Sequence, residues 1–313
     1  MKRVIVLLNM GGVDELSQVK LFLTNMFNDP YILGIKNRHL RAFVAWMITQ
    51  MRLKPATQNY IQLGGKSALG DITRSLITKL NAKFGSEELI FDYAMNYTPP
   101  FAADTLAKYK DADEIVLFPL YPHHSVTTIA SSLDSAKRAI NELGIGAKID
   151  IIEYFYENDT FNDIVIADIA KSLGDAKAKE IDLIFSAHSL PQKVIDKGDL
   201  YERHLNEHIE ILKSKLSSAG LKFKSISLAY QSRLGPVKWL GPNLSEVLPK
   251  LPSKRAMIYP ISFCIDNSET DFELAVEYKH IANENKFEFY KVVKAPNDSD
   301  EFAAFIANSI AKL

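Results

Sequence analysis

Short runs of apolar and β-branched residues recur along the whole chain, and each has the length of a buried strand. Eight of them cover residues 4–10, 89–97, 114–121, 149–155, 181–188, 225–230, 256–263 and 287–293. Longer segments with the apolar spacing of a helix lie between most of these runs, at 69–84, 130–143, 161–173, 201–216 and 270–283. Strands that alternate with helices predict parallel sheets covered by helices on both faces.

The predicted strands could close into one (β/α)8 barrel or form two open sheets of four. A short break at 144–148 contains Gly144 and Gly146 near the middle of the chain, with comparable βα halves on either side. We therefore predict an α/β protein with two domains, each a parallel four-stranded sheet flanked by helices. The first domain covers residues 1–146 and the second residues 147–298, while residues 299–313 form a terminal helix with an acidic first turn.

Composition and charge narrow the range of partners. Of 313 residues, 37 are Lys or Arg and 38 are Asp or Glu, so no overall field attracts nucleic acid, and we expect no nucleic-acid partner. The single cysteine, Cys264, excludes an internal disulfide and a cysteine-rich zinc or iron–sulfur site, as expected for the cytoplasm. No apolar stretch approaches the ~20 residues that span a bilayer, and the run at 4–10 is short for a signal peptide.

The carboxyl ends of the predicted strands hold the candidate chemistry, because ligands of open parallel sheets bind beyond those ends. Aromatic or histidine side chains occur at most of these ends, which lie at 9–12, 96–100, 121–125, 186–191, 230–232 and 262–266. Such a lining suits a flat apolar ligand better than a phosphate. The glycine pairs at 11–12 and 64–65 match neither a dinucleotide fingerprint nor a phosphate loop.

His188 follows the apolar run that begins at residue 181, and Pro191 ends that run soon afterwards. The imidazole should therefore project from a strand end into the loop layer, where a histidine can act as a base or a metal ligand. It could equally tie down a loop by hydrogen bonds, so a partner has to decide between these roles.

The segment 269–280 provides candidate partners. At 100° per residue, Glu269, Glu273, Glu277 and His280 fall within an arc of about 80° on one helix face. Like charges four residues apart destabilise a helix by roughly 0.2–0.5 kcal/mol per pair, so this stripe favours a cation. Its oxygen ligands and single nitrogen ligand suit Fe²⁺ or another first-row ion in transit better than a closed structural site. A solvated acidic face is the alternative interpretation.

The segment 32–54 combines an apolar run containing Phe43 and Trp46 with basic side chains on both sides. The basic residues are Lys36, Arg38, Arg41, Arg52 and Lys54. Such a segment could hold an apolar ligand that carries carboxylates, rest on a membrane surface, or form an ordinary amphipathic core helix.

Several motifs together resemble one known family. The chain reads FSAHSLP at 185–191, GDLY at 198–201, YQSRLGP at 230–236 and WLGP at 239–242, which in order and spacing closely resembles the central signature of ferrochelatases. Further matches lie at 7–12, at Tyr60 before 64–65, at 119–122 with Ser125 and 127–128, and at 260–263 leading into 269–270. The resemblance covers nearly the whole chain.

The resemblance implies two Rossmann-like, chelatase-type domains with a porphyrin cleft between them and the terminal helix folded back on the first domain. In that family the equivalents of His188 and Glu269 face each other across the cleft as the catalytic pair. The acidic helix carries a π-type distortion, and segment 32–54 forms an apolar lip with Arg52 near a propionate. The implied metal ligands are His188, Glu269, Glu273 and Glu277, and the implied porphyrin contacts are Asn9, Met10, Arg52, Tyr121, Ser125, Trp239 and Phe263.

The implied activity is a lyase reaction of haem biosynthesis, in which Fe²⁺ enters protoporphyrin IX and two protons leave. Iron is then a substrate, and we expect no resident cofactor, no iron–sulfur cluster, a monomer, and peripheral membrane contact at most through residues 32–54. Coproporphyrin III as substrate, Co²⁺ insertion into another tetrapyrrole, and a non-catalytic haem carrier stay open as alternatives.

The chain departs from the family pattern at a few positions. Asn267 stands where a histidine is common, Asn96 where an arginine is expected, and Leu200 where the motif has proline. His123 and His124 replace a more usual Gln-Tyr pair.

Overall fold

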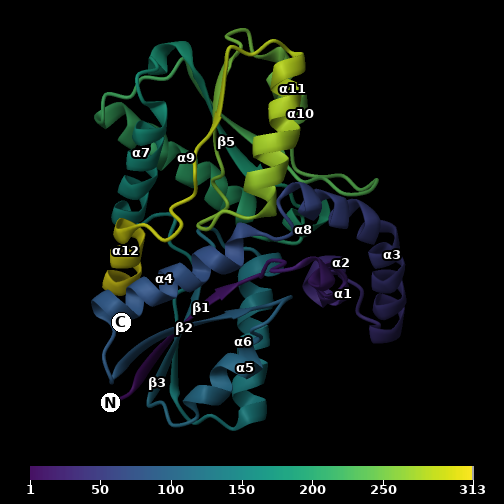
Figure 1. The fold of residues 1–313 in the computed structure, drawn as a ribbon, viewed down its shortest axis with the longest axis vertical. Coiled ribbons are helices and arrows are strands. Elements are labelled where there is room, and N and C mark those ends of the chain that lie inside the picture. Colours follow the sequence, from purple (N-terminus) through teal and green to yellow (C-terminus); the bar gives the residue numbers. More distant parts are fainter. Residues whose placement is uncertain (312–313) are drawn as a thin grey trace. The chain divides into compact units, whose positions relative to one another are not determined.

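The computed structural model describes residues 1–311, and its strands form two parallel four-stranded sheets (Figure 1). The first sheet has the order β2-β1-β3-β4 and consists of β1 (Arg3–Asn9), β2 (Leu89–Met95), β3 (Glu114–Pro119) and β4 (Lys148–Ile151). The second has the order β6-β5-β7-β8 and consists of β5 (Asp182–His188), β6 (Ser225–Gln231), β7 (Arg255–Tyr259) and β8 (Phe289–Val292). All eight predicted strands are therefore confirmed, and two open sheets replace the barrel alternative.

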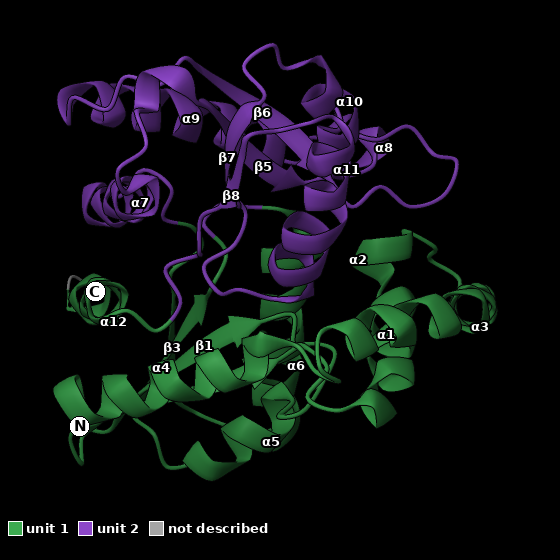
Figure 2. Ribbon diagram, turned by 45° about the horizontal axis from the view of Figure 1, so that its top comes forward, with its two compact units in different colours: residues 1–121, 125–154, 298–313 green, residues 122–124, 155–297 purple. Residues whose placement is uncertain are grey.

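The chain divides into two compact units, coloured separately in Figure 2. The first unit contains residues 1–121, 125–154 and 298–313, and the second contains residues 122–124 and 155–297. The short piece 122–124 joins the second unit because the backbone N–H groups of Phe155 and Tyr156 donate to Pro122 O at 3.2 and 3.1 Å.

The helices of the first unit surround its sheet. They are α1 (Val19–Asn28), α2 (Pro30–Leu33), α3 (Arg38–Gln62), α4 (Ala68–Phe84), α5 (Ala102–Leu106), α6 (Ser131–Leu143) and α12 (Asp300–Ile310). Short 3₁₀ turns lie at Leu16–Gln18 and Ala107–Tyr109, and a π-helix at Val126–Ala130 precedes α6. The terminal helix α12 packs on α4, where Lys79 and Lys83 pair with Asp300 at 2.9 and 2.7 Å.

The second unit has its own helices on both faces of its sheet. They are α7 (Asp159–Leu173), α8 (Gln192–Ile195), α9 (Tyr201–Ser218), α10 (Leu244–Val247) and α11 (Tyr278–Glu284). A π-helix at Glu269–Glu277 runs directly into α11, and 3₁₀ turns lie at Ala178–Glu180 and Leu248–Lys250. The predicted helix at 270–283 is thus present, with its first half wound as a π-helix.

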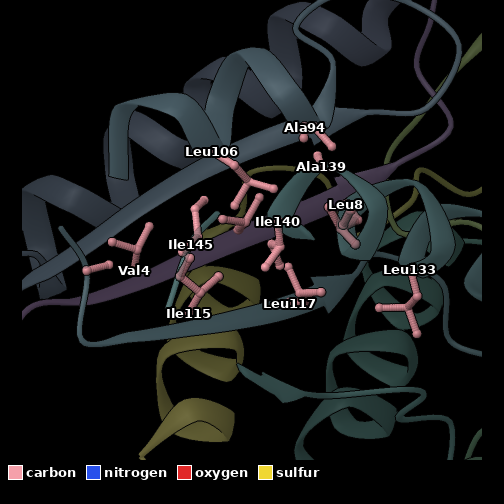
Figure 3. Packing of buried hydrophobic residues seen from close by; sticks show 14 of the residues in the cluster. Val4, Leu8, Ala94, Leu106, Ile115, Leu117, Leu133, Ala139, Ile140 and Ile145 are labelled. Carbon is pink, nitrogen blue, oxygen red and sulfur yellow. The ribbon is translucent and has the colours of Figure 1, made fainter. Parts of the chain in front are cut away.

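The first core lies between the sheet and the α5–α6 layer (Figure 3). Alternate residues of β1, Val4, Val6 and Leu8, point into it, while the intervening Ile5 and Leu7 are buried on the other face. On that other face Phe118 meets Phe305 of α12 edge-on, with ring centroids 6.4 Å apart. Burial on both faces explains why the strands read as continuous apolar runs.

The second core repeats this arrangement. Ile184 of β5 and Ile258 of β7 pack against a layer that includes Leu274 of the π-helix and Tyr278 of α11. Because the π-helix contributes to this core, its acidic residues have a fixed position relative to the ends of the strands.

The turn after β1 requires a glycine. Gly11 has φ +93°, and a Cβ there would lie 2.4 Å from Thr98 Oγ1. The chain can therefore pass close to the segment after β2 only without a side chain at this position. Among residues 1–311, no helix has both the length and the apolar character needed to cross a membrane.

Candidate active site

The candidate site lies at the carboxyl ends of three neighbouring strands of the second unit. His188 is the last residue of β5, Gln231 is the last residue of β6, and Ser262 follows β7. Since β5 lies between β6 and β7, these ends converge, and the π-helix Glu269–Glu277 begins shortly after them. This is the edge of a parallel sheet at which ligands bind.

His188 and Glu269 form one hydrogen-bonded pair. The Nδ1 atom of His188 lies 2.8 Å from Oε2 of Glu269, and the side chains are 36% and 22% exposed. Because the carboxylate accepts, Nδ1 carries the hydrogen, and Nε2 is the atom that can meet a ligand. The expectation that the two side chains face each other across a porphyrin cleft was wrong, because a contact of 2.8 Å leaves no room for a macrocycle between them.

Ser232 joins this pair to a second carboxylate. Its Oγ lies 2.7 Å from Glu269 Oε2 and also contacts Glu273 Oε2, while its backbone N–H donates to Glu273 Oε1 at 2.7 Å. Gln231 Nε2 donates to Glu269 Oε2 at 3.3 Å. A hydroxyl has one proton to give, so Ser232 can serve both carboxyl groups only when Glu273 holds a proton and donates it.

The charges of the site shift one another's protonation. Burial alone would lower the pKa of His188, but the negative charge and hydrogen bond of Glu269 raise it above the usual value. Burial opposes ionisation of Glu269 as well, but His188 and the hydrogen bonds from Ser232 hold its pKa below the usual value. For Glu273, burial and the charge of Glu269 raise the pKa to about 7.

The residues predicted to share one acidic helix face have different surroundings in the structure. Glu269 and Glu273 reach Ser232, whereas Glu277 is exposed. His280 is 73% exposed and lies 3.1 Å from Glu284, so it is separate from the pair at His188. Within residues 1–311, no group of three or more His, Cys, Asp or Glu side chains is arranged to hold a metal ion.

Asn267, which replaces a histidine of the family pattern, has a structural task. It is buried, its Oδ1 accepts the backbone N–H of Glu269 at 2.8 Å, and its Nδ2 donates to Ile265 O at 3.1 Å. These bonds fix the first residue of the π-helix, so Asn267 orients Glu269 through the backbone. Cys264, nearby in sequence, is buried, and burial raises the pKa of its thiol.

Comparisons with known proteins identify the family of this chain. A family model described as Ferrochelatase matches residues 2–313. A protein named Ferrochelatase from Campylobacter fetus subsp. fetus is 66% identical over 313 residues, covering 100% of both chains, and one from Campylobacter concisus is 59% identical over 306 residues, covering 98% of this chain and 96% of its own. This chain belongs to the ferrochelatase family.

Solved structures extend the likeness of this ferrochelatase in fold alone. A structure of SirB from Bacillus subtilis with Fe³⁺ has a TM-score of 0.59 at 9% identity and covers 100% of this chain and 95% of its own. A structure of CbiX, described as the terminal enzyme for siroheme biosynthesis in denitrifying bacteria, has a TM-score of 0.52 at 14% identity, covering 100% and 99%. The chelatase-type fold predicted from the sequence is thereby confirmed.

The predicted porphyrin contacts of the ferrochelatase lie in both units. In the first unit Asn9 ends β1, and its Oδ1 accepts the backbone N–H of Met10 at 2.8 Å. Tyr121 is buried, with its hydroxyl 3.2 Å from Ser132 Oγ, and Ser125 is the N-cap of the π-helix Val126–Ala130.

In the second unit Trp239 and Phe263 belong to segments that contact the end of β5 or the loop after it. Trp239 forms an antiparallel bridge with Pro191, so it lies next to the loop that follows His188, and its Nε1 donates to Leu234 O at 3.1 Å. Phe263 follows Ser262, whose Oγ accepts the backbone N–H of His188 at 3.2 Å. The roles of these residues toward porphyrin stay predictions.

Arg52 lies on α3, which presents a large apolar surface. The exposed side chains of this helix include Leu40, Phe43, Trp46, Met47 and Met51, of which Phe43 is 59% exposed and Trp46 57% exposed. The buried residues of this 25-residue helix are Ala45, Thr49 and Tyr60. The alternative that this segment is an ordinary core helix is therefore wrong.

Another departure from the family pattern, His123, belongs to a buried hydrogen-bond chain of the second unit. Asn162 Nδ2 donates to Tyr156 O at 2.9 Å, so its Oδ1 accepts from His208 Nε2 at 2.7 Å. His208 Nδ1 then accepts from His123 Nε2 at 2.8 Å. Burial lowers the pKa of both histidines, that of His208 to about 3, so both stay neutral in the folded protein.

The buried hydrogen-bond chain through His123 and His208 predicts that the protein loses stability in acid. Below pH 6.5 the two histidines bind protons in the unfolded protein but stay neutral in the folded protein. As the pH falls, the free energy of unfolding should therefore decrease by up to about 1.4 kcal/mol per pH unit for each histidine. For His208 the fall continues towards its folded pKa of about 3. Urea denaturation at pH 7, 6 and 5 measures this slope, and the double variant His123→Gln/His208→Gln should show a shallower one. Equal slopes for both proteins would contradict the prediction.

Proposed function

We propose that this ferrochelatase inserts Fe²⁺ into protoporphyrin IX through His188 and Glu269. Membership of the family makes the chain a lyase of haem biosynthesis with porphyrin and iron as substrates. The observation that carries the assignment of the site is the 2.8 Å contact between His188 Nδ1 and Glu269 Oε2 at the end of β5. Iron is a substrate in this reaction, so the proposal needs no resident metal or other cofactor.

Insertion needs three events. Ferrous iron must lose water, two pyrrole protons must leave, and the flat macrocycle must bend so that its nitrogen lone pairs reach the metal. We assign the bending to apolar walls that include Met10 and Phe263, which would use binding energy as strain of ~1–5 kcal/mol.

The acidic residues would handle protons and metal. With Nδ1 of His188 held by Glu269, the Nε2 atom is the one that can take a pyrrole proton or bind iron. Ser232 connects Glu269 to Glu273, so once Glu273 has released its own proton, a proton taken up by Glu269 can pass to Glu273 through the Ser232 hydroxyl. Glu277, on the exposed part of the same helix, would lead iron in or protons out.

The substrate assignment can be tested with the purified protein. Under anaerobic conditions, Fe²⁺ and Co²⁺ are each offered with protoporphyrin IX, coproporphyrin III and sirohydrochlorin, and loss of free tetrapyrrole is followed optically. We expect the highest kcat/KM for Fe²⁺ with protoporphyrin IX. A preference for coproporphyrin III, or for Co²⁺ with sirohydrochlorin, would replace the substrate, and tight haem binding without any metallation would indicate a carrier.

The catalytic role of His188 predicts a selective loss of turnover. His188→Ala should lower kcat by at least about 100-fold, because a base or ligand at the reacting centre is lost. Porphyrin binding, measured by fluorescence titration, and the melting temperature should change little. His280→Ala provides the matched control, since this histidine is exposed and paired with Glu284. Wild-type turnover in His188→Ala would refute the role.

The exposed face of α3 supports two further roles, as a lip that meets porphyrin and as a peripheral membrane contact. Residues 30–70 contain six Lys or Arg residues and no Asp or Glu, in a chain whose net charge is −1. A helix with exposed Phe43 and Trp46 and basic neighbours suits an anionic lipid surface. Arg52 on the same helix would meet a propionate of the porphyrin.

Vesicle sedimentation tests the membrane contact. Wild-type protein should sediment with vesicles that contain anionic phospholipid and less with neutral vesicles, and salt should weaken the binding. Phe43→Ser/Trp46→Ser should lower the partition coefficient about tenfold or more, because two apolar side chains no longer insert. Val237→Ser removes a similarly exposed apolar side chain of the second unit and should have no effect. Equal binding by all three proteins would contradict the proposal.

The cytoplasmic location and the monomeric state stay predictions from the sequence. The cysteine usage supports the first, and size-exclusion chromatography with light scattering would test the second.

A further inference from the structure

We propose that Tyr201 and Ser262 are positioning residues that hold His188 in place for metal insertion. The inference rests on the proposed function, because it gives a role to groups that do not touch the reacting atoms. Tyr201 is the last residue of the Gly-Asp-Leu-Tyr motif and the first residue of α9, and Ser262 lies two residues after Pro260. Neither has a role in the chemistry described above.

The two hydroxyl groups close a ring of three hydrogen bonds on the backbone of His188. The N–H of His188 donates to Ser262 Oγ at 3.2 Å, Ser262 Oγ lies 2.6 Å from the Tyr201 hydroxyl, and that hydroxyl donates to His188 O at 2.9 Å. A carbonyl oxygen can only accept, so the Tyr201 hydroxyl donates its one hydrogen to His188 O. Ser262 must therefore donate to Tyr201, and every bond in the ring has a fixed direction.

The ring replaces the sheet at the point where the sheet ends. The pairing of β5 with β7 stops at Phe185 and Tyr259, and one more bond, from Ile261 N–H to Ser186 O at 3.0 Å, follows it. The backbone groups of His188 point to the same side as those of Ser186, because residues two apart in a strand are equivalent. Without the ring, the N–H and C=O of His188 would lack partners on the β7 side.

Tyr201 can hold the backbone of His188 in place because its own position is fixed by packing and hydrogen bonds. The residue is 6% exposed, its backbone N–H donates to Asp199 Oδ1 at 2.9 Å, and the ring of His123 lies edge-on to its own with the ring centroids 6.1 Å apart. Burial also raises the pKa of its hydroxyl, which keeps the proton that the ring needs. The consequence is that the Cα–Cβ direction of His188 is set before substrate binds, and the bond to Glu269 then sets the imidazole plane.

Removal of either hydroxyl should lower catalysis without unfolding the protein. Tyr201→Phe and Ser262→Ala should each lower kcat for iron insertion by about 10- to 100-fold, which is typical for groups that orient a metal ligand. The KM for porphyrin should stay within about twofold of wild type, and Ser262→Thr, which keeps a hydroxyl, should restore most of the activity. Because either change opens the same ring, Tyr201→Phe/Ser262→Ala should lose little more than the single variants.

Tyr259→Phe is the matched control. The Tyr259 hydroxyl is buried and has no hydrogen-bond partner among the described residues, so its removal should leave kcat unchanged. A readout that does not depend on activity is amide hydrogen exchange by NMR with ¹⁵N-histidine: the His188 amide should exchange faster in Tyr201→Phe and in Ser262→Ala, but not in Tyr259→Phe.

The outcomes separate the inference from the function on which it depends. If His188→Ala is inactive while Tyr201→Phe and Ser262→Ala retain wild-type kcat, the positioning role is overturned and the proposed function stands. If His188→Ala is fully active, both are overturned. Losses of kcat that are fully additive, or that follow a lower melting temperature, would also overturn the positioning role.

Discussion

The hydrogen bond between His188 Nδ1 and Glu269 Oε2 joins the end of a strand to the start of a helix, and the geometry of the site follows from it. His188 is held by the termination of β5, and Glu269 is held by Asn267 at the first residue of a π-helix. The bond can therefore form only because sheet and helix share a core through Leu274 and Ile184. Burial alone would lower the pKa of one partner and raise that of the other, and their contact reverses both tendencies.

The two units share one sheet topology but carry different side chains on the corresponding π-helices. In each sheet the strand that comes first in the sequence, β1 or β5, lies second in the strand order. The third strand in that order, β3 or β7, is followed in the sequence by a π-helix, at Val126–Ala130 in one unit and at Glu269–Glu277 in the other. The first of these π-helices begins with hydroxyl residues such as Ser125 and Thr127, whereas the second carries carboxylates. Similar backbones thus offer neutral polar groups in one half and acidic groups in the other.

Apolar periodicity was sufficient to predict the strands and most of the helices, because burial on both faces leaves a clear signal. The predicted strands 89–97, 114–121 and 256–263 ran past the observed ends because residues beyond those ends, such as Tyr97, Tyr121 and Ile261, are also buried. The helix predicted at 130–143 matches α6, whereas the π-helix Val126–Ala130 before it has no distinctive composition and was not predicted.

The candidate site was predicted less evenly than the fold. Polar residues at strand ends pointed to His188, and helical spacing pointed to Glu269 and Glu273. That spacing also included His280, because an ideal 100° repeat ignores the π winding that sends His280 to the surface. Ser232, Tyr201 and Ser262 were missed as individual residues because hydroxyl groups are common, and only the folded backbone shows which of them meet.

Ser232 occupies a conformation that serine rarely adopts. Its φ of +64° lies in the left-handed region, where a residue with a side chain costs about 1–3 kcal/mol. Glycine would remove that cost but would also remove the hydroxyl that spans Glu269 and Glu273. Serine at this position therefore lowers the folding stability through its backbone conformation. In return, its hydroxyl oxygen lies between two carboxyl groups.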